Sequence, residues 1–296
     1  MQVSTNTIKM LNTSVKTIFQ TAFDGVESEW SKIAMEVPSS NASNTYPWLG
    51  STFGICEWLG DRVIQNLKTY DYTIKNKSFE GTIGIDRDDI EDDNLGIYTP
   101  VIQNLAATAK RHPDELIFGL LKSGTSALCY DKKPFFSDKH VVGEGKKAET
   151  VSNYQAGEED AWYLLDTSRP VKPLIWQKRK DYKIVSKTDE ADDNVFMRKQ
   201  YLYGVDGRGN AGYGFWQMAY CSKAELTQEN LEAAYAAMCS IKGDNGKPLG
   251  VKPTLLVVPP SLRSKAKSLV EADKLANGQD NPNKNLVKVL DTAWLA

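Results

Sequence analysis

The sequence has 296 residues, of which 41% are hydrophobic and 25% charged, with 36 lysines and arginines against 38 acidic residues. This length suffices for two or three modest domains, or one elongated domain, with a sizeable core. The near-neutral charge disfavours binding to nucleic acid or anionic lipids, and neither a run of 18 apolar residues nor a secretory signal is visible.

The N-terminal segment, residues 1–30, has the spacing of an amphipathic helix. Its apolar residues recur at three- and four-residue steps; they are Ile8, Leu11, Val15, Ile18, Phe19 and Ala22. The sequence Phe23-Asp24-Gly25 would end the helix. The apolar face is suited to packing on its own body or on a neighbouring molecule, and the pattern does not distinguish the two.

Residues 36–60 combine prolines and glycines with large aromatic side chains, so no regular element is predicted there. The rings in and beside this stretch must be buried against something; they are Trp30, Tyr46, Trp48, Phe53 and Trp58. Packing under an extended arm and contact with another subunit are equally compatible with the sequence.

Two alternating runs within residues 61–95 predict a β-hairpin. Tyr72 and Ile74 alternate before residues 75–78, and a second run alternates after them at Phe79, Gly81, Ile83 and Ile85. The remaining positions are polar, so the hairpin should project from the body.

A long helical pattern follows from about Tyr98 to Leu121, after a cap at Asp93 and Asn94. Pro113 is followed by two acidic residues, which is typical of a helix start. The pattern therefore fits two helices, or one long helix kinked at Pro113.

The middle of the chain is less regular. Residues 129–160 are polar and predict a surface loop or insertion. Strand-like runs return at 161–165 and 173–176, and the glycines of residues 201–220 predict another hairpin.

The last third predicts an α/β layer. Thr227 should cap a helix that runs to about Ile241, and residues 254–258 form an all-apolar strand. Ser261 should cap a further helix that runs to about Ala276 and is closed by residues 277–278.

Residues that could carry chemistry are few. The four cysteines form no CxxC pair and suit reduced, partly buried thiols; they are Cys56, Cys129, Cys221 and Cys239. The two histidines fall before a proline, at His112, and in the polar segment, at His140. We therefore predict no catalytic, cofactor-binding or metal-ligating residue and no cofactor, since a zinc site needs paired ligands at short spacing.

Three local motifs have simpler explanations. Residues 207–212 match GxGxxG, but an aromatic, strand-like run follows, so a turn is favoured over a dinucleotide site. The acidic residues of 86–93 fail the EF-hand pattern, which favours a solvated turn over a looser cation site. The basic residues 178–180 are too few to indicate DNA binding and suit a solvated face.

Stretches along nearly the whole chain resemble the major head subunit family of Mu-like prophages. No single stretch is specific, but their order and coverage are. They are Asn44–Gly50, Glu57–Arg62, Asp88–Tyr98, His112–Leu116, Ala161–Pro170, Tyr203–Gln217, Leu255–Ala266 and Val289–Leu295.

The resemblance implies an α+β protein with the HK97-like phage capsid fold. That fold has an N-terminal arm, an E-loop hairpin, a peripheral domain with a long spine helix, and an axial domain. Placed on this sequence, the expected parts are an arm at 1–45, an E-loop region at 46–96, a mainly peripheral domain at 97–225 with the spine at about 98–123 and the insertion at 129–160, and a mainly axial domain at 226–296.

The implied function is that of a major capsid protein, not an enzyme. It would assemble into hexamers and pentamers of the icosahedral head of a Mu-like tailed phage, in the host cytoplasm and then in the virion. Scaffold, portal and decoration proteins would be its partners, packaged double-stranded DNA would be contacted non-specifically, and no membrane would be involved. Deletion of residues 68–87 should leave a soluble subunit that forms no closed shell.

Three other functions are weighed against this one. An encapsulin-like compartment would share the fold. A cytosolic hydrolase would use Cys129 or Cys221 with a histidine. A DNA-binding protein would show steep salt dependence, which the charge balance disfavours.

Overall fold

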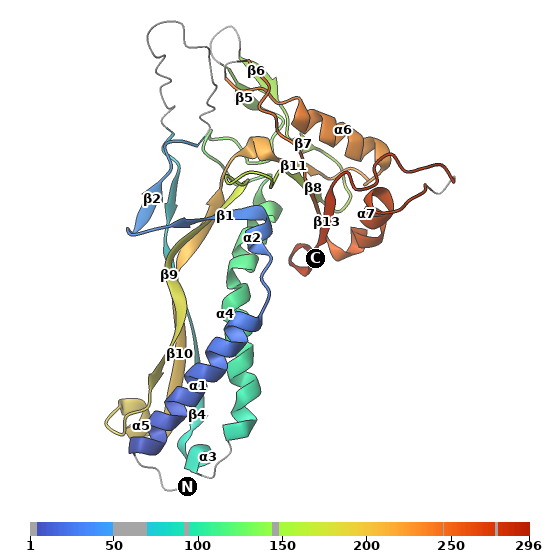
Figure 1. Ribbon diagram of the computed structural model, residues 1–296. Helices are drawn as coiled ribbons and strands as arrows, with labels where there is room; N and C mark the ends of the chain where they lie inside the picture. The colour runs from blue at the N-terminus through green and yellow to red at the C-terminus, as the bar shows by residue number, and fades with distance from the viewer. Residues whose placement is uncertain (1–4, 50–69, 92–94, 144–147, 245, 276–277) are drawn as a thin grey trace, which may run out of the picture.

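The computed structural model describes residues 5–49, 70–91, 95–143, 148–244, 246–275 and 278–296. Figure 1 shows an elongated part, in which long strands lie beside two helices, joined to a second part that holds the remaining sheet and helices. None of the helices in these ranges combines the length and apolar character that a membrane crossing needs.

The elongated part is built on a four-stranded sheet of order β1-β9-β10-β4. Its strands are β1 (Ala34–Pro38), β4 (Lys77–Asp86), β9 (Leu174–Lys187) and β10 (Gln200–Tyr213). β10 pairs antiparallel with both β9 and β4, and β1 pairs parallel with β9. The helices of this part are α1 (Thr5–Gly25), α2 (Trp30–Ile33), α3 (Arg87–Glu91), α4 (Leu95–Ser123) and α5 (Asp193–Arg198).

The N-terminal helix packs on its own body. Leu11, Val15 and Phe19 are buried in one cluster with residues of α4 and β10, among them Ile102 and Tyr203. Their four-residue spacing places them on one face of α1, as the sequence predicted. The helix prediction for residues 1–30 is confirmed over Thr5–Gly25.

α4 is one continuous helix of 29 residues that contains Pro113. Of the two sequence-based alternatives, the single long helix is therefore correct. The carboxylate of Asp114 does not start this helix. It accepts hydrogen bonds from the Ser28 hydroxyl and the backbone N–H groups of Glu29 and Trp30, at 2.9, 2.9 and 2.6 Å. It thus satisfies N–H groups at the start of α2, which intrahelical bonds leave free. The caps expected at residues 93 and 94 lie outside the described residues.

The second part holds a five-stranded sheet of order β13-β12-β8-β11-β7. Its strands are β7 (Tyr154–Gln155), β8 (Trp162–Leu165), β11 (Ala219–Ser222), β12 (Leu255–Val258) and β13 (Lys288–Asp291). Helices α6 (Gln228–Cys239) and α7 (Arg263–Val270) cover it, and the short 3-10 turns are η2 (Trp216–Met218), η3 (Pro260–Leu262) and η4 (Ala293–Leu295). Thr227 caps α6 by accepting from the Asn230 N–H, so this predicted helix and the strand after it are confirmed.

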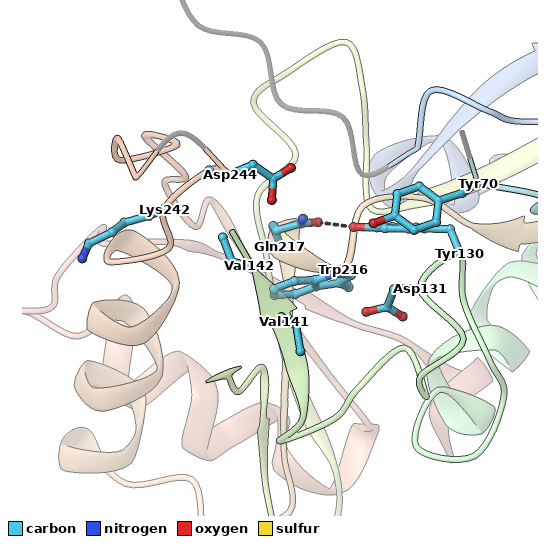
Figure 2. A pocket seen from close by; sticks show the side chains of 10 residues that line it. Tyr70, Tyr130, Asp131, Val141, Val142, Trp216, Gln217, Lys242 and Asp244 are labelled. Atoms are coloured by element: carbon cyan, nitrogen blue, oxygen red, sulfur yellow. Dashed lines mark hydrogen bonds between the residues drawn. The ribbon is translucent and has the colours of Figure 1, made fainter. Parts of the chain in front are cut away.

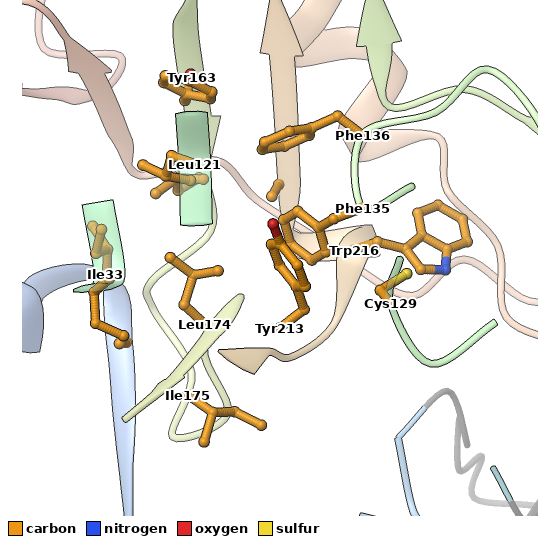
Figure 3. Packing of buried hydrophobic residues seen from close by; sticks show 14 of the residues in the cluster. Ile33, Leu121, Cys129, Phe135, Phe136, Tyr163, Leu174, Ile175, Tyr213 and Trp216 are labelled. Carbon is orange, nitrogen blue, oxygen red and sulfur yellow. The ribbon is translucent and has the colours of Figure 1, made fainter. Parts of the chain in front are cut away.

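A single aromatic-rich cluster joins the two parts (Figure 3). It contains Ile33 from α2, Leu121 from the end of α4, Leu174 from β9 and Tyr163 from β8. The ring of Phe135 stacks on that of Tyr213 with centroids 4.5 Å apart. Because aromatic side chains bury large areas, this cluster binds the two sheets into one body.

The hairpin predicted within residues 61–95 is wrong. The first run becomes β3 (Thr73–Lys75), which pairs with β2 (Ser43–Thr45). The second run becomes β4, which pairs with β10 along ten residues. Alternation revealed both strands but not their partners, which lie far away in the chain. Deletion of residues 68–87 would therefore remove a strand of the main sheet and does not isolate a projecting loop.

The hairpin predicted at residues 201–220 is also wrong. Residues 200–213 form one strand, and its hairpin partner is β9, reached through α5. A side chain at Gly209 would place its Cβ 2.6 Å from the Gln177 carbonyl oxygen. This glycine therefore serves close strand packing and not a turn.

Two further expectations need correction. Residues 129–136 are not a surface loop, because Cys129, Tyr130, Phe135 and Phe136 are buried; the insertion also contains the paired strands β5 (His140–Val142) and β6 (Glu149–Val151). The helix after Ser261 is shorter than predicted, running from Arg263 to Val270. The Ser261 hydroxyl donates to Asp160 instead of capping the helix.

Candidate functional site

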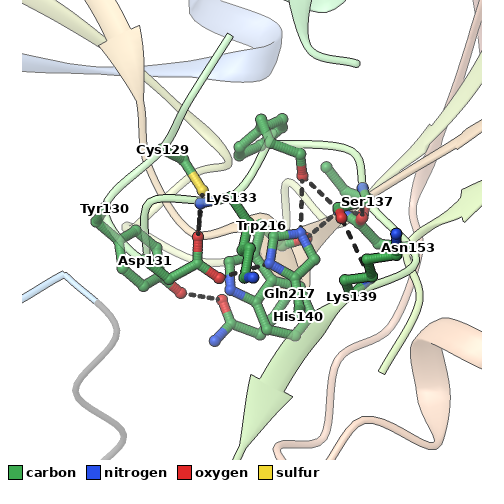
Figure 4. Close-up of polar contacts among 12 residues, drawn as sticks. Cys129, Tyr130, Asp131, Lys133, Ser137, Lys139, His140, Asn153, Trp216 and Gln217 are labelled. Carbon is green, nitrogen blue, oxygen red and sulfur yellow. Dashed lines mark hydrogen bonds and ion pairs between the residues drawn. The ribbon is translucent and has the colours of Figure 1, made fainter. Parts of the chain in front are cut away.

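The residues most able to carry chemistry gather in one buried cluster, shown in Figure 4. Cys129, Asp131 and His140 place a thiol, a carboxylate and an imidazole within 4.8 Å of one another. The Cys129 thiol donates to Oδ1 of Asp131 at 3.1 Å. The His140 ring contacts Oδ2 of Asp131 through Nδ1 at 2.6 Å and the Phe135 carbonyl oxygen through Nε2 at 3.2 Å.

Packing explains why these polar groups lie together. The His140 ring is fully buried and lies flat on the indole of Trp216, with ring centroids 4.0 Å apart and planes 6° from parallel. The backbone N–H of Lys133 also donates to Oδ1 of Asp131 at 3.0 Å. Each buried group therefore has a partner, as interiors require.

The cluster is poorly arranged for nucleophilic catalysis. Catalysis by a cysteine needs an imidazole that removes the thiol proton. Here the thiol contacts the carboxylate, and both ring nitrogens of His140 are taken up by other oxygens. Burial raises the pKa of Cys129 well above its usual range, and the neighbouring Asp131 adds to this effect. The thiol therefore stays protonated, unlike an activated nucleophile.

The same distances argue against a metal ion between these groups. Two ligands about 2.0–2.1 Å from a tetrahedral zinc ion stand about 3.3 Å apart. The His140 nitrogen and the Asp131 oxygen are 2.6 Å apart, which is the separation of a direct hydrogen bond. We interpret the cluster as a polar contact that fixes the 129–140 segment against the core.

Within the described ranges, the remaining cysteine and histidine side chains form no thiol–imidazole pair. Burial raises the pKa of Cys221 to about 12. Nδ1 of His112 and the Tyr182 hydroxyl form a hydrogen bond of 2.6 Å, and the His112 ring lies against Phe79. Burial lowers the pKa of His112. Cys239 is partly buried, and Cys56 lies outside the described residues.

The cavity next to the cluster is too small for a substrate. The cavity shown in Figure 2, lined by Tyr130, Asp131 and Gln217, has room for about one water molecule, at about 20 Å³. A wider, open groove of about 410 Å³ lies between β6 and the end of α6. A Lys242–Glu149 ion pair of 3.9 Å is the charged contact across it.

The basic motif found in the sequence forms ion pairs with neighbouring side chains. Lys178 forms ion pairs with Glu36 and Asp181 at 2.6 and 3.3 Å, and Lys180 pairs with Asp206. The basic run on β9 is thus neutralised locally, as the solvated-face interpretation expects. In the acidic stretch, residues 87–91 form the short helix α3, where the sequence predicted a turn.

Exposed apolar side chains are the strongest surface feature. On α5, Phe196 is 79% exposed and Met197 73% exposed. Ile97 of α4 and Met10 of α1 are exposed on elements that end at the same extremity of the elongated part (Figure 1). Large apolar side chains exposed together at one end of a protein favour a surface that contacts another molecule.

Sequence reasoning missed the buried polar residues that hold this structure together. Gln177, Asp131 and Asp114 each bind groups far away in the chain or in a loop, and no local pattern identifies them. The only available signal was the incompatibility of a glutamine with the apolar start of β9, where its neighbours Ile175 and Trp176 are buried.

Comparisons with known proteins identify similar chains over the full length. The family model described as Mu-like prophage major head subunit gpT matches residues 8–295. The major capsid protein of Escherichia phage Mu is 46% identical over 288 residues, covering 94% of this chain and 93% of that protein.

Solved structures agree. A chain from the procapsid of bacteriophage JBD30 matches with a TM-score of 0.90 and 49% identity, covering 99% of this chain and 100% of that one. A chain from the JBD30 capsid decorated with minor capsid protein trimers matches with a TM-score of 0.76 and 37% identity, covering 90% of each chain.

Proposed function

This chain belongs to the Mu-like prophage major head subunit family and is therefore a capsid protein of the virion, with an HK97-like fold; from this premise we propose that it assembles into the hexamers and pentamers of an icosahedral phage head. The observation that carries the proposal is the near-complete two-way match to a procapsid chain. A closed shell needs repeated contacts between identical subunits, and broad surfaces serve that need better than a catalytic pocket.

Two features of the chain support self-assembly. The apolar side chains of Phe196 and Met197 are exposed at one end of the molecule. Residues 50–69, which include the aromatic residues Phe53 and Trp58, lie in the chain between the paired strands β2 and β3. We assign both features to contacts with neighbouring subunits.

The domain assignment follows the two parts of the structure. In this assignment the arm of residues 1–45 consists of α1, α2 and the strand after them. Segment 46–72 takes the place of the E-loop, and α4 is the spine helix. The five-stranded sheet draws strands from 154–165, 219–222 and 255–291. We therefore propose that the axial domain includes these earlier strands as well as residues 226–296, and that the chain crosses between domains more than once.

The partners proposed are those that a phage head requires. They are further copies of this chain, scaffold and portal proteins, and packaged double-stranded DNA held without sequence recognition. Because a related capsid carries trimers of a minor capsid protein, a decoration protein of that kind is the partner that we propose for the outer surface.

We further propose that the protein has no catalytic activity. The hydrolase alternative required Cys129 or Cys221 beside a histidine. Cys129 instead contacts a carboxylate, and burial raises the pKa of both thiols. An encapsulin-like compartment is disfavoured because the relatives named above are phage head proteins.

Electron microscopy of the purified protein tests the proposed function. We expect closed, icosahedral particles, or capsomers that close when scaffold protein is added. A sample that remains monomeric by sedimentation with scaffold present, at concentrations that allow shell assembly, would contradict the proposal. A control with α4 interrupted by Phe118→Asp should be unfolded, since this residue is fully buried.

A further inference from the structure

Segment 46–72 lies in the chain between strands β2 and β3, and its two described ends are close together. The flanking strands β2 and β3 pair over three residues each. Ile74 is buried, but the other side chains of the pair are half-buried or exposed. A two-stranded pair of this size is marginally stable in water. Other contacts must therefore hold the two ends of the segment.

The side chain of Gln177, on β9, contacts both ends. It is fully buried. Its Oε1 accepts a hydrogen bond from the Tyr46 hydroxyl at 2.7 Å. Its Nε2 donates to the Ile74 carbonyl at 3.0 Å and to Oδ1 of Asn76 at 2.7 Å. Since Tyr46 follows β2, Ile74 is in β3 and Asn76 follows β3, one amide joins both ends to the main sheet.

Asn76 extends this network to the chain before β2. Its Nδ2 donates to the Ser39 hydroxyl and the Asn41 carbonyl, both at 2.8 Å, and its backbone N–H donates to the Ala42 carbonyl at 2.9 Å. Ser39 in turn donates to Oδ1 of Asn44 at 2.9 Å. The network therefore links the start and the end of the segment through buried groups.

A second set of contacts binds the same ends to β10. The backbone N–H of Tyr46 donates to the Tyr72 carbonyl, and the Tyr72 hydroxyl accepts from the Tyr213 backbone N–H, both at 2.8 Å. A Cβ atom at Gly212 would lie 2.2 Å from the Ile74 side chain, so a larger residue would force that side chain to shift.

We propose that Gln177 is a positioning residue for shell assembly, which fixes both ends of segment 46–72 on the body in a single arrangement. This inference rests on the proposed function, because it requires that the segment contacts neighbouring subunits. Any other placement of the ends would leave buried amide, hydroxyl and carbonyl groups without partners, which is strongly unfavourable in a low-dielectric interior. A symmetric shell needs the same contact from every copy, so a single arrangement favours closure.

Two variants and a matched control test the proposal. Gln177→Leu removes the amide at similar size. Tyr46→Phe removes one hydroxyl and serves as the milder variant if Gln177→Leu does not fold. The control is Asn281→Leu, which removes another buried amide, between α7 and β13, that donates to the carbonyls of Leu269 and Ala272 at 2.9 and 3.0 Å.

The measurements are thermal melting, amide hydrogen exchange over residues 70–76, and the yield of closed shells by sedimentation and microscopy. We expect the Gln177 and Tyr46 variants to fold and to exchange faster over 70–76. Shell yield should fall by about tenfold in Tyr46→Phe, the factor that one lost buried hydrogen bond produces, and by at least that much in Gln177→Leu, which loses three. Asn281→Leu should lower the melting temperature, yet assemble like the wild type below it.

Wild-type yield of regular shells from Gln177→Leu, or from Tyr46→Phe where Gln177→Leu does not fold, would overturn the proposal, as would an equal loss of assembly in the Asn281 control. These results are distinguishable from failure of the proposed function, in which the wild-type protein itself would form no shells.

Discussion

The carboxylate of Asp131 contacts Cys129 and His140. Because this carboxyl group can be protonated, its contribution to the stability of the fold depends on pH. Burial acts to raise the pKa of Asp131, but the hydrogen bond and the charge of His140 outweigh burial, and the pKa lies below its ordinary value. A carboxyl group of this kind stabilises the fold above its unfolded pKa, about 3.9, and that contribution is lost as pH falls through the lower folded pKa.

We therefore expect Asp131→Asn to reduce the acid dependence of stability. Urea unfolding between pH 7 and pH 3 should show a loss of about 1–3 kcal/mol at neutral pH, because the buried ring loses its charged partner. Below about pH 4 the variant should lose less further stability than the wild type does. Asp138→Asn, at an exposed carboxylate in the same segment, is the control. An acid dependence that matches the wild type in Asp131→Asn would show that the cluster does not act in this way.

Single buried polar residues were the least predictable part of the site. The polar composition of residues 129–140 predicted a surface loop. Composition does not reveal that Asp131 and His140 form a hydrogen bond with each other in the interior. The partners of Gln177 could not be predicted either, since Tyr46 and Asn76 are more than 100 residues away. The prediction of buried thiols at Cys129 and Cys221 needed less information, since free cysteine is among the residues most often buried.

At the scale of elements, β10 shows why glycine runs mislead. Its glycines resemble turn residues, but Gly209 lies where β9 approaches most closely, with its would-be Cβ 2.6 Å from a backbone oxygen. Elements with strong periodicity were predicted well: α1, α6 and β12 needed only the spacing of their own apolar residues. Strand partners were not, because pairing of β4 with β10 depends on contacts that are distant in sequence.

Gly209→Ala should therefore destabilise the main sheet. We expect a loss of about 1–3 kcal/mol in the free energy of unfolding, the range found for overpacked sites, because the added methyl group meets backbone that cannot rotate away. Gly81→Ala on β4 is the matched control, since its Cβ would meet only the Leu105 side chain, at an ordinary 3.4 Å. Chemical denaturation measures the free energy of unfolding of both variants. Equal values for the two would refute the close-packing explanation.

Asp114 joins two helices, and its loss should be felt at the contact between them. Asp114→Ala removes the acceptor of three hydrogen bonds from the start of α2. We expect a loss of about 2–4 kcal/mol, the range for breaking several hydrogen bonds to one charged group, together with faster amide exchange at Glu29 and Trp30. Glu115→Ala, at the exposed neighbouring position, should stay within about 0.5 kcal/mol of the wild type. Slow exchange in Asp114→Ala would mean that other contacts hold α2.

At the scale of the whole molecule, order along the chain was more informative than any local motif. The resemblance that named the fold rested on stretches from residue 44 to residue 295, and the two-way coverage of relatives agrees with it. The arrangement of parts was less accessible, because the five-stranded sheet is assembled from three separate regions of the chain. The exposed apolar surface proposed to contact neighbours could not be predicted for a similar reason: exposure of an apolar residue depends on what packs against it.

The exposed end of the elongated part offers the sharpest test of assembly at this scale. Val195 anchors α5 in the core formed with α1, which leaves Phe196 and Met197 directed to solvent. Replacing both with serine removes apolar contact area without touching the core, so thermal stability should be unchanged, within about 0.5 kcal/mol. Shell formation should weaken by at least about tenfold, because two large apolar side chains each contribute more than 1 kcal/mol when buried at an interface.

A control separates this effect from a general change in solubility. Val141→Ser alters another exposed apolar side chain, 56% exposed, on β5 in the second part of the molecule. Light scattering, used to follow shell assembly of both variants, should show this control assembling at the wild-type rate. If the Phe196 and Met197 double variant assembles equally fast, the extremity is not a subunit contact. The subunits of a shell bind one another through many such surfaces at once. A strong effect of these two residues on assembly would therefore place this end of the molecule at a contact repeated in every capsomer.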